Sequence, residues 1–216
     1  MTQKPRAILY VDGFNLYHPI HELRANHLKW LDLTALGRLI CQDRQHELVG
    51  VTYCTAFQRN DPAKMARHKT YISALESTGM VKTEMGHYME QNTPPCSNCG
   101  LMGTKETEKQ TDINVALSLF SDAMKNKFDW AYLLSADSDQ AATAKYMRHF
   151  FEEKKLVSVV PPGKEISNNI ANFVDGKRKL NRGDLEKCRF NSILLFNDGK
   201  SPIRCPKEYD LPRPQT

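Results

Sequence analysis

The chain has 216 residues, a formal net charge of +5 at pH 7 and six cysteines. This length suits one well-buried domain with an appendage, and the modest positive charge suits a polyanionic partner without requiring one. No apolar run approaches the roughly 20 residues that span a bilayer and no signal-peptide pattern opens the chain, so we expect a cytoplasmic protein whose cysteines are thiols or metal ligands.

Strand and helix signals alternate along the first 175 residues. Residues 91–107 interrupt them, because two prolines, two glycines and many short polar residues predict an irregular segment. Apolar or β-branched runs predict strands over 7–12, 47–57, 80–90, 130–137 and 156–162. Helical periodicity predicts helices over 33–45, with Asp32 or Thr34 as the N-cap, and over 62–79, opened by Pro62 and stopped at Gly79. It also predicts helices over 112–127 and 140–154. This alternation predicts an α/β fold with a parallel, doubly wound sheet and helices on both faces.

Three of these elements end or begin in carboxylates. "ILYVD" ends at Asp12, and "YLLSADSD" places Asp137 and Asp139 after another strand. The carboxyl ends of strands beside the switch point share one crevice, so these side chains are expected to meet. Glu108 and Asp112 are four residues apart, and helical spacing would aim both the same way.

Carboxylates gathered in one crevice repel one another, and a hard divalent cation relieves the repulsion. Mg²⁺ or Mn²⁺ would suit oxygen ligands there and could activate water against a phosphodiester. Gly13 is expected to let the backbone turn sharply after the strand. The alternative for each aspartate is a cap: Asp112 could cap the helix that follows it, and Ser138 or Asp139 could cap the next one.

Three segments taken together carry a family resemblance. "ILYVDGFNLY", "TEKQTDINVAL" and "YLLSADSDQ", in this order and followed by "SVVPP", resemble the NYN domain, a PIN-like nuclease family that includes the LabA-like proteins. The resemblance covers about residues 6–175 and implies a parallel α/β sheet and a metal-dependent ribonuclease.

The resemblance also implies roles for individual residues. Asp12, Asp112 and Asp137 would be the core metal ligands, with Asp139 and Glu108 assisting. Asn15 would hold the first loop or contact a phosphate. Gln140 and Ala141 stand where the family more often has an apolar residue, a difference that we interpret as one of packing more than of chemistry.

Cys96 and Cys99 form a C-x2-C spacing that is typical of structural zinc. The remaining ligands could come from His87, from Cys54, or from Cys188 and Cys205, and the alternative is a pair of reduced surface cysteines in a turn.

Basic residues near the chain's end are candidates for contacts to RNA phosphates. "GKRKLNRGD" predicts a basic loop, followed by a proline-rich tail. The proposed substrate-binding set is Asn15, Lys109, Lys177, Arg178, Lys179 and Arg182. The alternative is a solvated charged face. Tyr17, His18 and His21 could stack on bases or simply pack their helix.

The sequence thus predicts an NYN-type domain over 1–175, with a possible zinc-knuckle insert at about 91–108, and a basic C-terminal extension over 176–216. The predicted function is a divalent-metal-dependent ribonuclease that acts on RNA, with a homodimer as a family expectation. One alternative is a catalytically silent RNA-binding or regulatory module, and a more remote one is a metal-dependent enzyme that acts on a small molecule. No P-loop and no G-x-G-x-x-G motif is present, so nucleotide hydrolysis and dinucleotide redox chemistry lack support.

Overall fold

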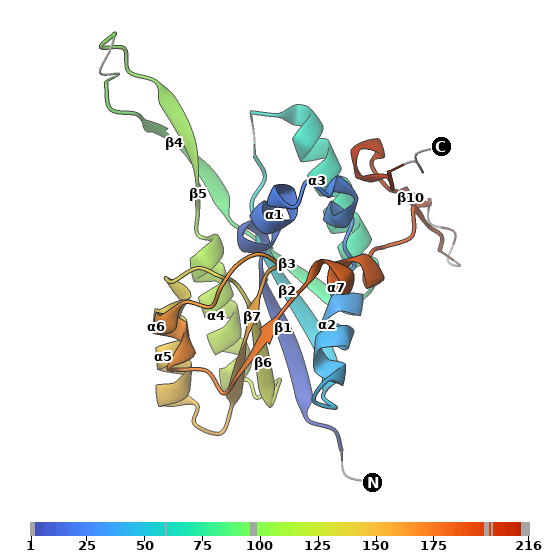
Figure 1. Ribbon diagram of the computed structural model, residues 1–216, viewed down its shortest axis with the longest axis vertical. Coiled ribbons are helices and arrows are strands. Elements are labelled where there is room, and N and C mark those ends of the chain that lie inside the picture. Colours follow the sequence, from blue (N-terminus) through green and yellow to red (C-terminus); the bar gives the residue numbers. More distant parts are fainter. Residues whose placement is uncertain (1–2, 59, 96–98, 197–198, 200, 213–216) are drawn as a thin grey trace.

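The computed structural model describes residues 3–58, 60–95, 99–196, 199 and 201–212, without the side chains of 90, 91 and 105–108. In this part of the chain, six parallel strands form one sheet in the order β3-β2-β1-β6-β7-β8 (Figure 1). They are β1 (Arg6–Asp12), β2 (Glu47–Thr55), β3 (Val81–Met85), β6 (Trp130–Leu134), β7 (Lys155–Val160) and β8 (Gly176–Lys179). The strand order reverses between β1 and β6, so the predicted doubly wound sheet is confirmed.

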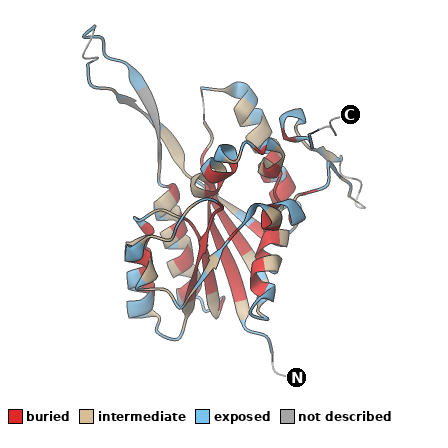
Figure 2. Cartoon of the chain, in the orientation of Figure 1, coloured by how far each residue is buried: buried red, intermediate tan, exposed pale blue. Residues whose placement is uncertain are grey.

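Helices cover both faces of the sheet. Alternation along β1 sends Ala7, Leu9 and Val11 into one buried cluster and Ile8 and Tyr10 into the other. Figure 2 shows that the central strands of the sheet are buried along most of their length. The first cluster is covered by α1 (Gly13–Glu22), α2 (Leu33–Gln42), α3 (Pro62–Glu76) and α7 (Arg182–Lys187), and the second by α4 (Thr111–Met124), α5 (Gln140–Phe150) and α6 (Asn168–Ala171). None of the helices in the described residues is both long and apolar enough to cross a membrane.

Local signals place the helix ends as the sequence predicted. The Asp32 side chain accepts hydrogen bonds from the backbone amides of Thr34 and Ala35, at 2.8 and 3.1 Å, and so caps α2. Pro62 occupies the first turn of α3, where its missing N–H leaves no helical hydrogen bond unmade. Gly79 follows that helix with φ +70°, a conformation that residues with a side chain rarely adopt.

The expectation of an irregular segment at 91–107 is wrong at both ends and holds for the described residues between them, 93–95 and 99–103. Strands β4 (His87–Asn92) and β5 (Thr104–Lys109) pair in antiparallel fashion and project from the body of the molecule (Figure 1). Their residues show no apolar alternation because the hairpin has no core to cover, so the usual strand signal is missing. The expected strand over 80–90 is therefore two strands, which separate at Gly86, whose amide donates to the Thr55 carbonyl at 2.7 Å.

The expectation of a basic loop after residue 175 is also wrong. Strand β8 pairs in parallel with β7, and α7 follows it behind a capping box in which the side chains of Asn181 and Asp184 each accept from the other's backbone amide at 3.0 Å. Leu180 and Leu185 are buried in the first cluster. The chain then forms a short pair of strands, β9 (Ile193–Leu194) and β10 (Ile203–Arg204), and a 3-10 turn, η2 (Lys207–Tyr209). A charged, short edge strand resembles a loop in sequence because its exposed residues need no apolar pattern.

Candidate functional site

Asp12 lies at the carboxyl end of β1 and is only 4% exposed. Alternation along β1 places its side chain on the side of Ile8 and Tyr10, which α4 and α5 cover. Its Oδ1 accepts hydrogen bonds from the amides of Phe14 and Asn15, each at 3.1 Å. The aspartate therefore caps α1, whatever else it does.

The other oxygen of Asp12 connects β1 to the segment after β6. Asn15 Nδ2 donates to Asp12 Oδ2 at 2.7 Å, and Ser135 Oγ lies 3.5 Å from the same oxygen. Ser135 Oγ accepts from the Asp137 amide at 3.1 Å, and Asn15 Oδ1 accepts from the Ala136 amide at 3.3 Å. The structure thus brings Asp12 at the end of β1 close to the loop that carries Asp137 after β6, and Asn15 holds that loop in place.

Gly13 matters because it has no side chain, and not because it adopts a conformation that other residues avoid. Helix α1 begins directly at Gly13, and this glycine is absent from the residues with positive φ. A Cβ at this position would lie 2.7 Å from the Cys54 carbonyl oxygen, so only glycine lets the start of α1 approach the end of β2. The expectation about its conformation is therefore replaced by one about close packing.

Asp112 and Gln140 meet where α4 and α5 begin. Asp112 is half-buried in the first turn of α4 and is not its cap, because Gln110 holds that position with φ +75°. Gln140 Nε2 donates to the Asp112 carbonyl at 3.1 Å, and the Gln140 amide donates to the Asp137 carbonyl at 3.3 Å. These two bonds attach the start of α4, which carries Asp112, to the loop that carries Asp137.

The oxygen of the Gln140 side chain is a feature that the sequence analysis missed. Gln140 is 2% exposed, and among the described residues no donor reaches its Oε1. A buried oxygen without a donor is costly unless a cation, a water or a substrate group pairs with it. The signal for it in the sequence was Gln140 itself, a polar residue at a position where the family more often has an apolar one.

The remaining acidic candidates lie less centrally. Asp139 is exposed, and its amide donates to Asp137 Oδ1 at 3.0 Å. It occupies the N-cap position of α5 without a side-chain bond to the helix. The expected helical alignment of Glu108 with Asp112 is wrong, because Glu108 belongs to β5 and α4 begins only at Thr111. The side chain of Glu108 lies outside the described residues, and Lys109 ends β5 opposite His87.

The donors at this edge suit a hard cation held by few protein ligands. Among the described side chains, no three His, Cys, Asp or Glu residues lie close enough together to hold a metal ion. Mg²⁺ and its relatives commonly need only one or two carboxylates, with waters and substrate phosphates completing the shell. The oxygens of Asp12, Asp137 and Gln140, with Asp112 attached to Gln140 through its backbone carbonyl, fit that kind of binding and not a closed protein cage.

The described residues show no group of three His, Cys, Asp or Glu side chains that could hold a zinc ion. Cys96 lies outside these residues, and Cys99 is exposed. His87 begins β4, where its Nδ1 lies 3.0 Å from Gln110 Oε1. Cys54 is fully buried in β2, where burial raises the pKa of its thiol to about 12 and so disfavours the thiolate that zinc requires. Cys188 and Cys205 belong to the C-terminal part, which Figure 1 places on the other side of the molecule from the β4–β5 hairpin. The zinc site stays a prediction.

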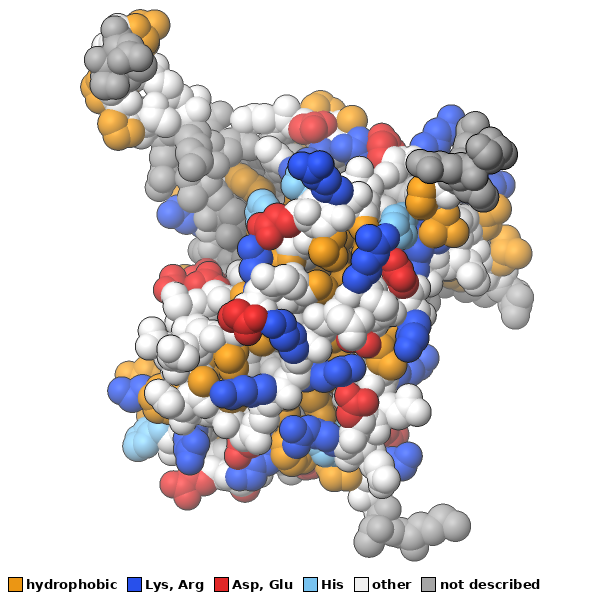
Figure 3. Space-filling model, in the orientation of Figure 1, with side chains coloured by type: hydrophobic (Ala, Val, Ile, Leu, Met, Phe, Trp, Pro, Cys, Tyr) orange, Lys and Arg blue, Asp and Glu red, His pale blue; other side chains and the backbone are white. Residues whose placement is uncertain are grey.

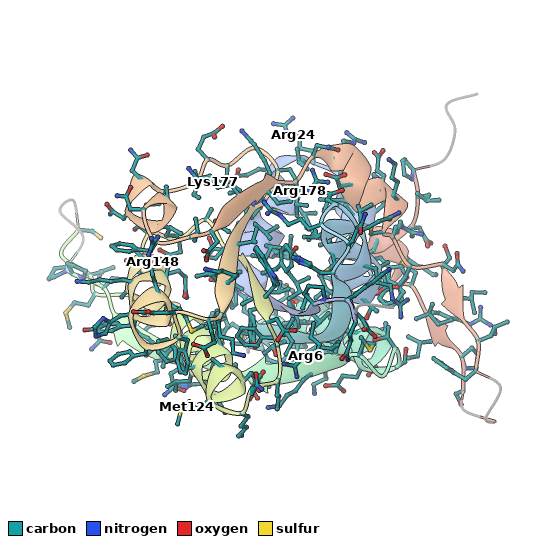
Figure 4. All side chains as sticks on the ribbon, turned by 90° about the horizontal axis from the view of Figure 1, so that it is seen from below. Arg6, Arg24, Met124, Arg148, Lys177 and Arg178 are labelled. Carbon is teal, nitrogen blue, oxygen red and sulfur yellow. The ribbon has the colours of Figure 1, made fainter. Side chains whose placement is uncertain are left out.

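Ion pairs occupy most of the predicted basic cluster. Figure 3 shows that Lys and Arg side chains are interspersed with Asp and Glu side chains over the visible face of the molecule. Figure 4 labels Lys177 and Arg178 on β8. Arg178 pairs with Asp43 at 3.1 Å and with Asp184 at 3.5 Å, Lys179 pairs with Glu165, and Arg182 pairs with Glu186 at 2.7 Å. Lys177 is exposed, and no carboxylate among the described residues pairs with it. The cluster therefore offers less free positive charge than its sequence suggests.

A cavity of about 490 Å³ lies on the other face of the same sheet edge. Gly13 and Thr55, at the carboxyl ends of β1 and β2, form its floor together with side chains of α1 and α3. Its wall includes His68, whose Nε2 lies 3.2 Å from Thr55 Oγ1. Burial, and then the charge of Lys64, lower the pKa of His68 to about 4, so this imidazole is neutral near pH 7.

Comparisons with known proteins agree with this architecture. The family model of the NYN domain matches residues 6–176. A protein of Pseudomonas putida, named 6-hydroxy-3-succinoylpyridine 3-monooxygenase HspA, is 25% identical over an aligned length of 240 residues including gaps, and the alignment covers 94% of this chain and 75% of that protein. The crystal structure of a protein of unknown function from Vibrio parahaemolyticus superposes with a TM-score of 0.54 at 16% identity, over 84% of this chain and 98% of that one, and so shares the fold.

Proposed function

Because this chain belongs to the NYN domain family, within the PIN-like nuclease superfamily, we propose that it is a divalent-metal-dependent ribonuclease. The observation that carries the proposal is the hydrogen-bonded series that joins Asp12, Asn15 and Ser135 to Asp137 at the strand switch point. This is the place where open α/β sheets bind ligands. The buried, donor-free oxygen of Gln140 supports a cation or polar ligand at the same edge.

The carboxylates of Asp12 and Asp137 would hold the cation, assisted by Asp112 and by Gln140 Oε1. A bound Mg²⁺ or Mn²⁺ would supply positive charge to the phosphodiester and lower the pKa of a water molecule. Asn15 fixes the rotamer of Asp12 by donating to Oδ2, while the two amides on Oδ1 hold the other side of the carboxylate. The Ser135 hydroxyl, which accepts from the Asp137 amide, fixes the start of the acidic loop.

The proposal is tested by cleavage of a pool of labelled RNAs with Mg²⁺, Mn²⁺ or chelator. Asp112→Asn and Asp137→Asn should each abolish metal-dependent products, because each removes a charged ligand. Glu153→Gln is the matched control, since this exposed carboxylate lies in the turn after α5. RNA that stays intact with wild-type protein would reject the nuclease; RNA bound without cleavage would instead favour the silent binding module.

A second candidate is a metal-dependent enzyme that acts on an aromatic small molecule. The similarity to a named hydroxypyridine monooxygenase spans nearly the whole chain, and the cavity beside the acidic edge is lined largely by aromatic rings. Such a reaction needs dioxygen and a two-electron reductant such as a reduced nicotinamide. Oxygen uptake that requires a hydroxypyridine acid, the reductant and the protein would support this candidate. A protein that cleaves RNA but consumes no oxygen with these reactants would reject it.

A further inference from the structure

The cavity between α1 and α3 combines planar side chains with positive charge. Aromatic rings from five separate segments line it: Phe14, Tyr17, Tyr53, Tyr71, Tyr88 and Tyr209. Its volume of about 490 Å³ lies in the range of sites for small ligands. None of the acidic candidates lines it, so it is distinct from the proposed metal site.

Contacts among the rings fix their orientation. Phe14 meets Tyr88 edge to face, with centroids 5.9 Å apart and planes at 72°. Tyr53 meets Tyr71 in the same manner, at 6.0 Å and 82°. Rings held in this way line the cavity in a fixed arrangement, so a further flat ring placed against them gains aromatic contacts without ordering its surroundings first.

Two lysines place the positive charge at one side of the cavity. The ammonium groups of Lys29 and Lys64 lie 4.7 and 5.3 Å from the centroid of the Tyr17 ring. Among the described residues, no carboxylate forms an ion pair with either lysine, and Lys64 instead donates to Gln58 Oε1 at 2.6 Å. Burial, and then the charges of Lys64 and Arg67, lower the pKa of Lys29. An anion at this position would relieve that repulsion.

A neutral apolar ligand does not suit this arrangement. It would cover both ammonium groups without pairing with them, and burying unpaired charge is costly. A simple inorganic anion would satisfy the lysines but make no contact with the aromatic lining. The ligand that uses both features is flat, aromatic and anionic.

We propose that this cavity binds one nucleotide, with the base among the rings of Phe14 and Tyr88 and the phosphate at Lys29 and Lys64. The assignment of a nucleotide, and not of another aromatic anion, rests on the proposed ribonuclease function. The polar atoms of Thr55, Gln58 and His68 in the wall offer hydrogen bonds to a base edge. The cavity would then seat a base of the RNA whose backbone reaches the carboxylates across the sheet edge.

Calorimetric titration in chelator tests the cavity without any cleavage. The probes are the four nucleoside monophosphates, the nucleosides, inorganic phosphate, and nicotinate as an aromatic carboxylate. At least one monophosphate should bind about five-fold or more tightly than phosphate, because stacking of one base contributes about that much at least. Equal affinity for phosphate and for all four monophosphates would overturn the proposal.

Two variants separate the base from the phosphate. Tyr88→Leu should weaken monophosphate binding by roughly 5- to 150-fold while leaving phosphate binding unchanged. Lys64→Met should reduce monophosphate affinity to that of the nucleoside, and Lys69→Met on the same helix is its control, because Lys69 is exposed and does not line the cavity. Monophosphate affinity that neither Tyr88→Leu nor Lys64→Met changes would refute the assignment, provided that both variants keep the wild-type melting temperature.

The outcome is distinguishable from that of the nuclease assay. Nucleotide binding with no RNA cleavage would support the cavity and reject the nuclease. Cleavage with no nucleotide binding would do the reverse. Binding of nicotinate but of no monophosphate would overturn the nucleotide assignment and favour the small-molecule candidate.

Discussion

Replacing Asp12 by alanine tests two effects on the free energy of unfolding that have opposite signs: the loss of a helix cap and the relief of repulsion among carboxylates. As a cap, it accepts from the amides of Phe14 and Asn15, and its replacement by alanine should cost about 1 kcal/mol. Alanine would also leave Asn15 Nδ2 without its partner at 2.7 Å, which costs about 1 to 3 kcal/mol in a poorly hydrated site. Asp12→Ala should therefore lower the free energy of unfolding by about 2 to 4 kcal/mol in chelator, the sum of these two costs.

Repulsion among the carboxylates would act in the other direction. If it outweighed the hydrogen bonds, Asp12→Ala would stabilise the protein, as removal of one of several like charges does. Urea unfolding in chelator, read as a change in midpoint at constant slope, decides between them. A variant as stable as the wild type, or more stable, would refute the role of Asp12 as a structural cap.

Metal linkage gives the second half of the same experiment. Mg²⁺ at ten times its dissociation constant should stabilise the wild type by about 1.4 kcal/mol, and both Asp12→Ala and Asp12→Asn should lose this increment. Asp12→Asn should nevertheless be more stable than Asp12→Ala, because asparagine caps helices as well as aspartate does. Equal stabilisation of all three proteins by Mg²⁺ would place the cation elsewhere.

Two further predictions concern pH and charge. Because the pKa of His68 is lowered to about 4 in the folded protein, unfolding takes up a proton between about pH 4 and 6.5; stability should fall by at most about 1.4 kcal/mol per unit as the pH is lowered through that window. His68→Gln should flatten this dependence of the urea midpoint on pH, and an unchanged slope would argue against a buried neutral imidazole. Lys177→Ala should weaken RNA binding and reduce its salt dependence without a loss of stability, whereas Arg178→Ala should mainly lower stability because it leaves Asp184 without its ion pair. Filter binding over a salt series, with urea unfolding beside it, measures both; equal effects on affinity would reject the distinction.

The sequence predicted what depends on neighbours along the chain. The apolar run before Asp12, the cap at Asp32 and the proline at the start of α3 each determine an element through local contacts, and each is confirmed. The strand order was predictable because alternating strands and helices allow few topologies. The meeting of Asp12 with Asp137 followed from the same rule and not from any local signal.

What the sequence did not predict depends on distant partners. Among the described residues, β4 and β5 pair with each other outside the main sheet, so they lack apolar alternation, and the sequence predicted only the start of β4, within the strand expected over 80–90. The role of Gln140 needs the backbone of Asp112, which lies 28 residues away. The cavity is assembled from separate segments, the last at Tyr209. Tyr17 and His18, which the sequence offered as base-stacking candidates, line it, but its other rings resemble ordinary core residues in the sequence.

The first turn of α1 links the two proposed sites. Its Asn15 holds Asp12 on one face of the sheet edge, and its Phe14 lines the cavity on the other. Gly13→Ala would place a Cβ 2.7 Å from the Cys54 carbonyl oxygen, so α1 must move away from β2 and carry both side chains with it. This overpacking should cost about 1 to 3 kcal/mol of stability and, below the melting temperature, weaken nucleotide binding and RNA cleavage together. Lys64→Met should weaken nucleotide binding while leaving the carboxylates in place. If Gly13→Ala likewise weakened nucleotide binding and left the carboxylate site unaffected, α1 would not couple the two sites.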